Sequence, residues 1–164
     1  QPEAWKSARV VPVYKKGSLS NPKNYRPVSL LPIISKVMER IVNCQIVNHL
    51  EKHHLLSTKQ YGFRSGLGTA DLLAVLGHDW SLAAGSGGCA HVLAVDIAGA
   101  FDRVSHPGVL HKAATLGIGG SLLQWLRDYL RNRTLSAIVN GQESAQFQIK
   151  AGVPQGSILG PPYS

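Results

Sequence analysis

The segment DIAGAFDRV, residues 96–104, places two carboxylates around a run of small residues. Asp96 follows the apolar run HVLAV, and Asp102 comes six positions later. A carboxylate at the end of a buried strand can hold Mg²⁺ through its oxygens, and small residues let a ligand approach the backbone. The competing interpretation is a strand-to-helix turn with an Asx cap, and these residues alone favour it.

A second candidate segment is GVPQGS, residues 152–157. Gly152 and Gly156 flank Pro154 and Gln155, which predicts a rigid turn that exposes backbone and one amide side chain. A plain tight turn is the alternative. His49 and His53 have the spacing of metal ligands on a helix, but they lack a nearby third ligand, so a structural role is favoured.

Several common enzyme classes are not indicated. The sequence contains no G-x-S-x-G elbow, no GxxxxGK[ST] phosphate loop and no HExxH pair. GFRSGLGT resembles a phosphate loop only superficially.

The positive charge is confined to one part of the chain. Residues 1–64 hold eleven Lys or Arg and three Asp or Glu, a net charge of +8, whereas residues 65–164 hold six of each. A basic segment attracts polyanions through counterion release, so nucleic acid backbones or nucleotide phosphates are candidate partners. A solvated basic surface without a partner is the alternative.

The composition limits the class of protein. With 164 residues, 44% apolar and 16% charged, the chain predicts one globular domain with a hydrophobic core. It has neither a bilayer-spanning apolar run nor the layout of a signal peptide, and Cys44 and Cys89 form no CxxC pair. We therefore expect a soluble intracellular protein that is not secreted.

The elements before the acidic segment follow from periodicity and turn residues. Residues 8–14 predict a strand, and KKGSLSNPKN after it predicts a basic exposed loop. A helix is predicted from Pro32, with Lys36, Glu39 and Arg40 on its other faces. Its expected apolar positions are Ile34, Val37, Met38, Ile41 and Leu50. A second helix, capped by Thr69, is expected to bury Leu72, Leu73, Leu76 and Trp80 before the connector AAGSGG.

The later elements alternate in type. HVLAVDI predicts a buried strand that ends at Asp96. One helix is predicted from Pro107 to Gly117, and another carries Leu122, Leu126, Tyr129 and Leu130. Residues 134–140 and 145–150 predict two strands joined through Asn140-Gly141. The whole pattern indicates an α/β (α+β) domain without internal repeats.

Ordered blocks along nearly the whole chain resemble the reverse transcriptases of non-LTR (LINE-type) retrotransposons. The blocks that carry the resemblance are ARVVPVYKKG, NYRPVSLLP, SKVMER, QYGFRSG, DIAGAFDRVSH, WLRDYLRNR and AGVPQGSILGP. The resemblance implies a right-hand polymerase fold. It places the fingers at about residues 1–90 and 105–150, and a partial palm at about 91–104 and 151–164.

The resemblance also implies roles for single residues. Asp96 corresponds to the first catalytic aspartate, and the Ile97 carbonyl would help to hold the second of two Mg²⁺ ions, with Mn²⁺ as a substitute. Phe101 resembles the residue beneath the incoming sugar that excludes a 2′-hydroxyl. Gln155 and Gly156 resemble the pair beside the nucleotide and the template. A lysine of the Lys15-Lys16 pair and Arg26 resemble the residues that clasp the triphosphate, and Arg64 resembles a template or backbone contact.

The implied activity is RNA-directed DNA polymerisation, with an RNA template, a DNA primer and dNTPs as partners and no membrane. The family's YxDD hairpin is not in the sequence, which has no adjacent acidic pair, and LGPPYS departs from the usual LGPLLF. We therefore expect a truncated or frame-shifted stretch that is inactive alone. The remaining palm, the thumb and an endonuclease would belong to the parent protein.

Two other functions remain open. One is a catalytically inactive nucleic-acid-binding remnant or co-opted fragment, which the missing YxDD favours. The other is an enzyme of a neighbouring family, such as a group II intron maturase or a viral RNA polymerase. The combination of NYRPVSLL with QYGFR favours the LINE branch over that second alternative.

Overall fold

A computed structural model describes residues 1–97 and 99–159, which fall into two compact units. The first unit joins Gln1–His53 to Gly99–Ser164, and the second unit is His54–Ala98. The predicted departure at Pro162–Ser164 and the small residue Ala98 lie outside the described residues. No helix among the described residues is long and apolar enough to cross a membrane.

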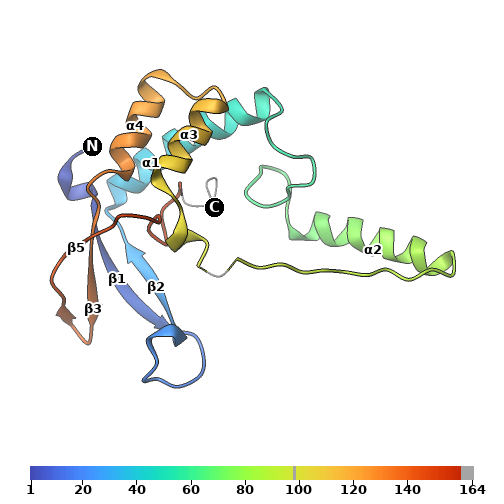
Figure 1. Cartoon of the computed structure of the whole chain (residues 1–164), viewed down its shortest axis with the longest axis horizontal. Coiled ribbons are helices and arrows are strands. Elements are labelled where there is room, and N and C mark those ends of the chain that lie inside the picture. Colours follow the sequence, from blue (N-terminus) through green and yellow to red (C-terminus); the bar gives the residue numbers. More distant parts are fainter. Residues whose placement is uncertain (98, 160–164) are drawn as a thin grey trace. The chain divides into compact units, whose positions relative to one another are not determined.

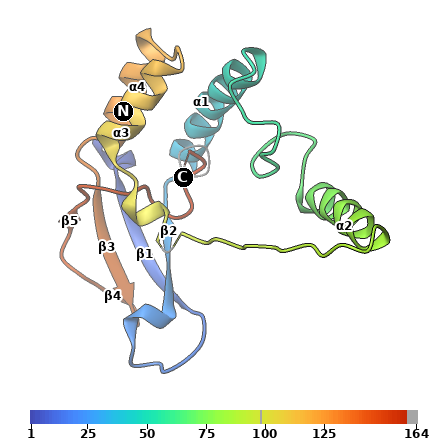
Figure 2. The same cartoon turned by 45° about the vertical axis from the view of Figure 1, so that its right-hand side comes forward.

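The first unit is built on a mixed sheet in the order β2-β1-β3-β4, as Figures 1 and 2 show. Its strands are β1 (Ser7–Tyr14), β2 (Tyr25–Leu30), β3 (Thr134–Val139), β4 (Gln142–Glu143) and β5 (Phe147–Gln148). β1 runs antiparallel to β2 and parallel to β3. The predicted strands at 8–14 and 134–140 are confirmed, and so is the mixed α/β class.

The sequence analysis predicted no strand here, and β2 contains Pro27, a residue that is rare inside sheets. In the structure Pro27 lies opposite Pro12 of β1. Neither proline has an N–H, so the pair fits a position of the ladder where facing residues exchange no hydrogen bonds. The β1–β3 ladder ends at Val10, so Pro12, which has no N–H, does not have to donate a hydrogen bond to β3.

The predicted strand at 145–150 is shorter than expected. The chain turns back at Asn140-Gly141, but it forms two separate two-residue strands, β4 and β5, along the same edge of β3. Between them Ser144 exchanges hydrogen bonds with Ala137, because its hydroxyl accepts from the Ala137 N–H and its own N–H donates to the Ala137 carbonyl. A side chain thus replaces part of the ladder.

Three helices complete the first unit: α1 (Ile33–Lys52), α3 (His106–Thr115) and α4 (Gly120–Leu130). They lie together beyond one end of the strands (Figures 1 and 2). Leu126, Tyr129 and Leu130 of α4 are buried, as the spacing predicts. The core continues through Ala8, Val109, Ala113, Val153 and Leu159.

The helix α1 is confirmed and Leu50 is buried as predicted, but most of its predicted apolar face is wrong. The buried positions are Ser35, Glu39, Val42, Ile46 and Leu50. Ile34, Val37 and Ile41 are instead 64%, 56% and 51% exposed. A glutamate is buried here because hydrogen-bond donors surround its carboxylate, a circumstance that apolar periodicity does not encode.

The second unit contains α2 (Thr69–Gly85) and extended chain. The N-cap is Gly68 and not Thr69, since Asp71 accepts the Gly68 N–H at 2.7 Å. The expected burial of Leu72, Leu73, Leu76 and Trp80 is also wrong, because no residue of α2 is buried. Helical spacing marks an apolar stripe, but burial needs a packing surface.

The predicted strand HVLAVDI is not present among the described residues 91–97. The segment forms no strand, and Leu93 and Val95 are 87% and 80% exposed. A β-rich sequence becomes a strand only when a second strand completes its ladder. Residues 54–97 provide no such partner.

Candidate nucleotide-binding site

The β1–β2 hairpin carries three of the predicted site residues, Lys15, Lys16 and Arg26, and its loop is ordered by hydrogen bonds. The Tyr25 hydroxyl donates to the Leu19 carbonyl at 2.8 Å, and the Asn24 side chain donates to the Ser18 carbonyl at 2.8 Å. The Tyr14 and Tyr25 rings also meet edge to face, with 5.7 Å between centroids. Asn24 and Tyr25 of NYRP therefore shape the loop, a role that the sequence did not reveal.

The basic side chains of this hairpin point away from the core. Lys15, Lys16 and Arg26 are all exposed, and Arg26 lies on β2 directly after Tyr25. Exposed lysine and arginine side chains on an ordered backbone are suited to bind an anion, because they can form charge-assisted hydrogen bonds to it without first leaving contacts within the protein.

The GVPQGS turn is attached to β2 through backbone atoms. The Ser29 N–H donates to the Gln155 carbonyl at 2.8 Å, and the Ser157 N–H closes the turn on the Pro154 carbonyl at 3.0 Å. Gly156 has φ +115°, and a Cβ there would lie 3.0 Å from the Ser29 carbonyl oxygen. Glycine at 156 is therefore required by the contact with β2, whatever else approaches its backbone.

The same turn is attached on its other side to the 3₁₀ segment Phe101–Arg103. The Val153 N–H donates to the Phe101 carbonyl at 2.9 Å, and the Gly152 N–H donates to the Val104 carbonyl at 2.8 Å. A Cβ on Gly152 would come within 2.8 Å of the Asp102 carbonyl oxygen. The two segments singled out by sequence, AFDRV and GVPQGS, thus lie against each other.

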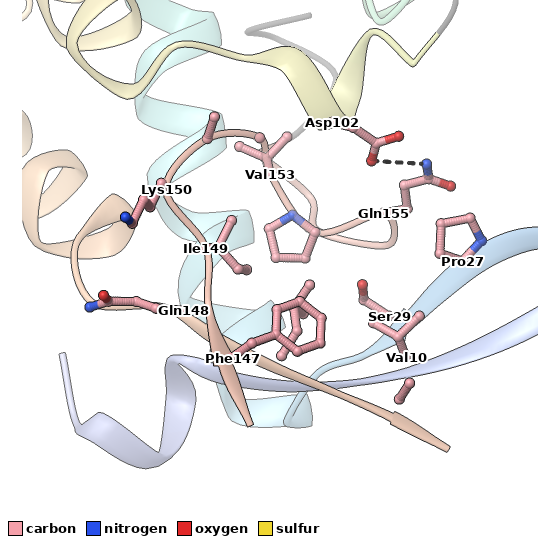
Figure 3. A pocket seen from close by; sticks show the side chains of 15 residues that line it. Val10, Pro27, Ser29, Asp102, Phe147, Gln148, Ile149, Lys150, Val153 and Gln155 are labelled. Carbon is pink, nitrogen blue, oxygen red and sulfur yellow. Dashed lines mark hydrogen bonds between the residues drawn. The ribbon is translucent and has the colours of Figure 1, made fainter. Parts of the chain in front are cut away.

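The hydrogen-bond partner of Asp102 is distant in sequence. Gln155 Nε2 donates to Asp102 Oδ1 at 3.5 Å, a long hydrogen bond that Figure 3 draws as a dashed line. This contact turns the Gln155 amide toward the carboxylate. It adds a side-chain link to the two backbone hydrogen bonds between the segments.

A pocket of about 420 Å³ lies between this turn and the sheet. Figure 3 shows Asp102 and Gln155 at one side of it, Lys150 and Gln148 at another, and Phe147 on its floor. Most of the remaining wall is apolar, from Val10, Pro27, Leu135, Ala137, Ile149, Val153 and Pro154. Apolar walls with a few polar groups are typical of sites for small molecules or bases.

The remaining predicted site residues belong to the second unit. Asp96 and Ile97 are exposed, and Arg64 is half-buried and donates from Nη1 to the Ser57 carbonyl at 3.1 Å. Arg26, Phe101, Gln155 and Gly156 all belong to the first unit, and backbone hydrogen bonds join the GVPQGS turn to the Phe101–Arg103 segment and to Ser29 of β2. The juxtaposition of Asp96, Ile97 and Arg64 with these residues stays a prediction.

The donors at Asp96 do not suffice for the implied pair of magnesium ions. Among residues 1–97 and 99–159, no three His, Cys, Asp or Glu side chains gather where they could hold a metal. Asp96 and the Ile97 carbonyl supply one carboxylate and one backbone oxygen, whereas Mg²⁺ takes about six oxygen ligands.

Sequence reasoning missed a buried polar cluster behind the turn. Glu39 of α1 is 0% exposed and accepts hydrogen bonds from Ser157 and from the Ile158 N–H. The Tyr129 hydroxyl lies 2.6 Å from Ser157 Oγ, and burial, followed by the Glu39 charge, raises the pKa of Tyr129 to about 12. The helical spacing of Ser35, Glu39, Val42 and Ile46 was the available signal.

Comparison with known proteins identifies the relatives of this chain. Residues 13–163 match the family model described as reverse transcriptase (RNA-dependent DNA polymerase). The chain is 37% identical over 161 residues to the RNA-directed DNA polymerase from mobile element jockey of Drosophila melanogaster, which covers 98% of this chain and 18% of that protein. It is 35% identical to the probable RNA-directed DNA polymerase from transposon X-element of the same species, with the same coverage.

A more distant relative is the Retrovirus-related Pol polyprotein from type-1 retrotransposable element R2 of Popillia japonica. It is 27% identical, and the match covers 98% of this chain and 22% of that protein. The chain thus spans about a fifth of the length of these relatives.

Proposed function

Because the chain belongs to the reverse transcriptase (RNA-dependent DNA polymerase) family, and its LINE-type resemblance is confirmed, we propose that it provides the nucleotide-binding part of an RNA-directed DNA polymerase. In this proposal the parent has a right-hand fold, with fingers at about 1–90 and 105–150 and part of the palm at about 91–104 and 151–164. Its substrates are an RNA template, a DNA primer and dNTPs. The rest of the polymerase and an endonuclease accompany this stretch in the parent.

The observation that carries the proposal is the hydrogen bond from the Ser29 N–H to the Gln155 carbonyl. It joins the strand that carries Arg26 to the turn that carries Gln155 and Gly156. A triphosphate bound by Arg26 and by Lys15 or Lys16 would have its sugar and base near that turn, with Phe101 beneath the sugar. Arg suits this task because its planar guanidinium binds two phosphate oxygens at once.

The pocket beside Gln155 supports a role in holding a base. Its volume of about 420 Å³ and its apolar wall are suited to a planar ring, and Gln155 offers one amide for a hydrogen bond. Asp96 and the Ile97 carbonyl are proposed to contribute to two Mg²⁺ ions, or Mn²⁺ in their place, once the parent adds further carboxylates. Bound metals would activate the primer hydroxyl and stabilise the leaving pyrophosphate.

The experiment is steady-state kinetics on this chain fused to a palm segment bearing a YADD hairpin, with poly(rA) template and dTTP. Arg26→Ala should raise the KM for dTTP by roughly tenfold or more, because one charge-assisted contact to phosphate is lost. Arg131→Ala, also exposed but at the end of α4, is the matched control and should leave KM unchanged. Equal effects of the two substitutions would reject the triphosphate clasp.

A second candidate is a nucleic-acid-binding remnant without catalysis. The specific observation in its favour is the net charge of +8 carried by residues 1–64. It predicts salt-dependent binding of duplexes by this chain, and no extension even by the fusion. A location in the nucleus and cytoplasm stays a prediction for either candidate.

A further inference from the structure

A buried carboxylate lies directly behind the nucleotide-facing turn. Glu39 of α1 accepts hydrogen bonds from Ser35 Oγ at 3.1 Å, from Ser157 Oγ at 2.8 Å and from the Ile158 N–H at 2.9 Å. A carboxylate that is 0% exposed is tolerated only where donors replace the water it has lost. Two of these three donors belong to residues that follow Gly156.

The protons of this cluster can be assigned from its geometry. Ser157 Oγ carries one hydrogen, which goes to Glu39, so the Tyr129 hydroxyl must donate to Ser157 Oγ across 2.6 Å. The Leu159 N–H also donates to Ser157 Oγ, at 3.1 Å. The hydrogen bonds therefore run in one direction, from Tyr129 through Ser157 to Glu39.

The ring of Tyr129 is itself held by two side chains. Trp125 stacks on it with 5.5 Å between centroids, and the Arg133 guanidinium lies 4.7 Å from its centroid. Arg133 Nη1 also donates to the Tyr129 carbonyl at 3.1 Å. The donor end of the chain of hydrogen bonds is thus fixed by packing in α4 and the residues that follow it.

The turn is consequently held on two sides of Gln155 and Gly156. Ser29 binds the Gln155 carbonyl from the β2 side, and Glu39 binds Ser157 and Ile158 from the α1 side. Only Gly156, at φ +115°, lies between these two attachments. Loss of the Glu39 attachment would release the Ser157 side of the turn while Ser29, Phe101 and Val104 still hold the other side, so that Gln155 and Gly156 could shift relative to β2.

We infer that Glu39 is a positioning residue for nucleotide recognition, which acts through Ser157 and Ile158 to fix the Gln155-Gly156 turn against β2. This inference rests on the proposed function, because it gives that turn the task of facing the nucleotide. Glu39 itself touches no substrate. A core residue without this task would affect stability alone.

The test compares nucleotide kinetics with stability in the YADD fusion. Glu39→Leu removes the acceptor, Ser157→Ala removes one of the two links to the turn, and Tyr129→Phe removes only the distant donor. Glu39→Leu should raise the KM for dTTP about tenfold, with kcat changed by less than about twofold, because the misplaced group binds nucleotide. The rise should be smaller for Ser157→Ala and smallest for Tyr129→Phe.

Two controls separate positioning from stability. Glu39→Gln keeps an oxygen that can face Ser157 and Ile158, so its KM should return most of the way to that of the unchanged protein. Ile46→Ala, at a fully buried site on the same helix, should lower the melting temperature without raising KM. If KM follows melting temperature across all five variants, the inference is overturned.

Hydrogen exchange on the 164-residue chain gives a readout that needs no catalysis. Glu39→Leu should speed exchange at the amides of Ile158 and Leu159 by at least about tenfold, while the β1 amides change little. Unchanged exchange at these amides overturns the inference whatever the fusion does. A fusion that never extends a primer, beside faster exchange in Glu39→Leu, would instead locate the failure in the proposed function.

Discussion

The two units of this chain differ in what holds their functional candidates. In the first unit, Arg26, Phe101, Gln155 and Gly156 stand on backbone segments that hydrogen-bond to one another. In the second unit, none of the described residues 54–97 is buried, and Asp96 is exposed on an extended segment. The predicted binding residues are organised by the chain itself, whereas the predicted catalytic carboxylate is not.

The difference follows from where each segment finds partners. The GVPQGS turn meets β2, the Phe101–Arg103 segment and Glu39, all within the first unit. The segment 91–97 is apolar at most positions, the pattern of a strand covered on both faces, yet residues 54–97 give it no ladder. Nucleotide recognition and catalysis should therefore respond differently when the chain is fused to a palm segment that bears a YADD hairpin.

The largest expected effect is on catalysis through Asp96. The 164-residue chain should show no primer extension on poly(rA) with dTTP and Mg²⁺ or Mn²⁺, and fusion to a YADD-bearing palm segment should restore it. In the fusion, Asp96→Ala should reduce extension by roughly a thousandfold or more, because a shared metal ligand is lost. Gel-based primer extension measures this.

The control for this prediction is Asp79→Ala, which removes an exposed carboxylate from α2 of the same unit and should leave extension unchanged. Full activity of the Asp96→Ala fusion would reject the assignment of Asp96. Strong, Asp96-dependent extension by the 164-residue chain would show instead that the site is already complete.

The next largest effect is on the stability of the first unit at alkaline pH. Its buried cluster raises the pKa of Tyr129 from 10.0 to about 12, through burial first and the Glu39 charge second. Because the folded pKa is the higher one, this contribution is fully present below pH 10 and is lost as the pH rises toward 12. The free energy of unfolding should therefore fall by up to about 3 kcal/mol over that window.

Urea unfolding followed by circular dichroism from pH 8 to 12 tests this, with Tyr129→Phe as the matched variant. The variant lacks the titrating hydroxyl, so it should lose less stability between pH 10 and 12 than the unchanged chain. Parallel pH profiles for the two would exclude Tyr129 as the group responsible.

In the first unit, sequence patterns predicted the helices and strands better than they predicted which side chains those elements bury. β1, β3, α1, α3 and α4 follow from strand-like and helical spacing and from turn residues, which are local properties. The buried face of α1 could not be predicted in this way, because Glu39 is buried by donors from residues more than a hundred positions away. β2 was not predicted, and the pairing of its Pro27 with Pro12 of β1 is a contact between strands that local spacing does not reveal.

The candidate site divides in the same manner. Motif resemblance identified Arg26, Gln155 and Gly156, but the link between their segments is a backbone bond from Ser29, which leaves no trace in residue type. For HVLAVDI and α2, pattern predicted burial and the structure has exposure. Periodicity describes which residues would pack, and it says nothing of whether a surface is present to pack against.

A smaller effect is expected on sugar selection in the first unit. Phe101 is half-buried, and its carbonyl is fixed by the Val153 N–H. In the YADD fusion, Phe101→Val should admit ribonucleotides roughly tenfold more readily, because the space beneath the sugar opens while the backbone contact remains. The ratio of kcat/KM for dTTP and UTP measures this. An unchanged ratio would make Phe101 a packing residue only.

The smallest effect concerns the binding of a nucleic acid duplex by the β1–β2 hairpin. The test compares lysines of the basic residues 1–64 with basic residues of the neutral stretch 65–164. Residues 1–64 carry the whole net charge of +8, and Lys15 and Lys16 lie exposed on the ordered loop between β1 and β2. Replacing both with Ala should remove about two phosphate contacts, which lowers the slope of log K against log salt by about 1.8 for B-form DNA. Between 0.05 and 0.2 M salt that difference amounts to about tenfold in affinity.

The paired control, Lys112→Ala with Arg131→Ala, removes the same charge from exposed positions of the neutral half. Fluorescence anisotropy with a labelled duplex measures both slopes. Equal losses in the two double variants would mean that net charge alone attracts the duplex, and a larger loss at Lys15 and Lys16 assigns the contact to the hairpin of the first unit.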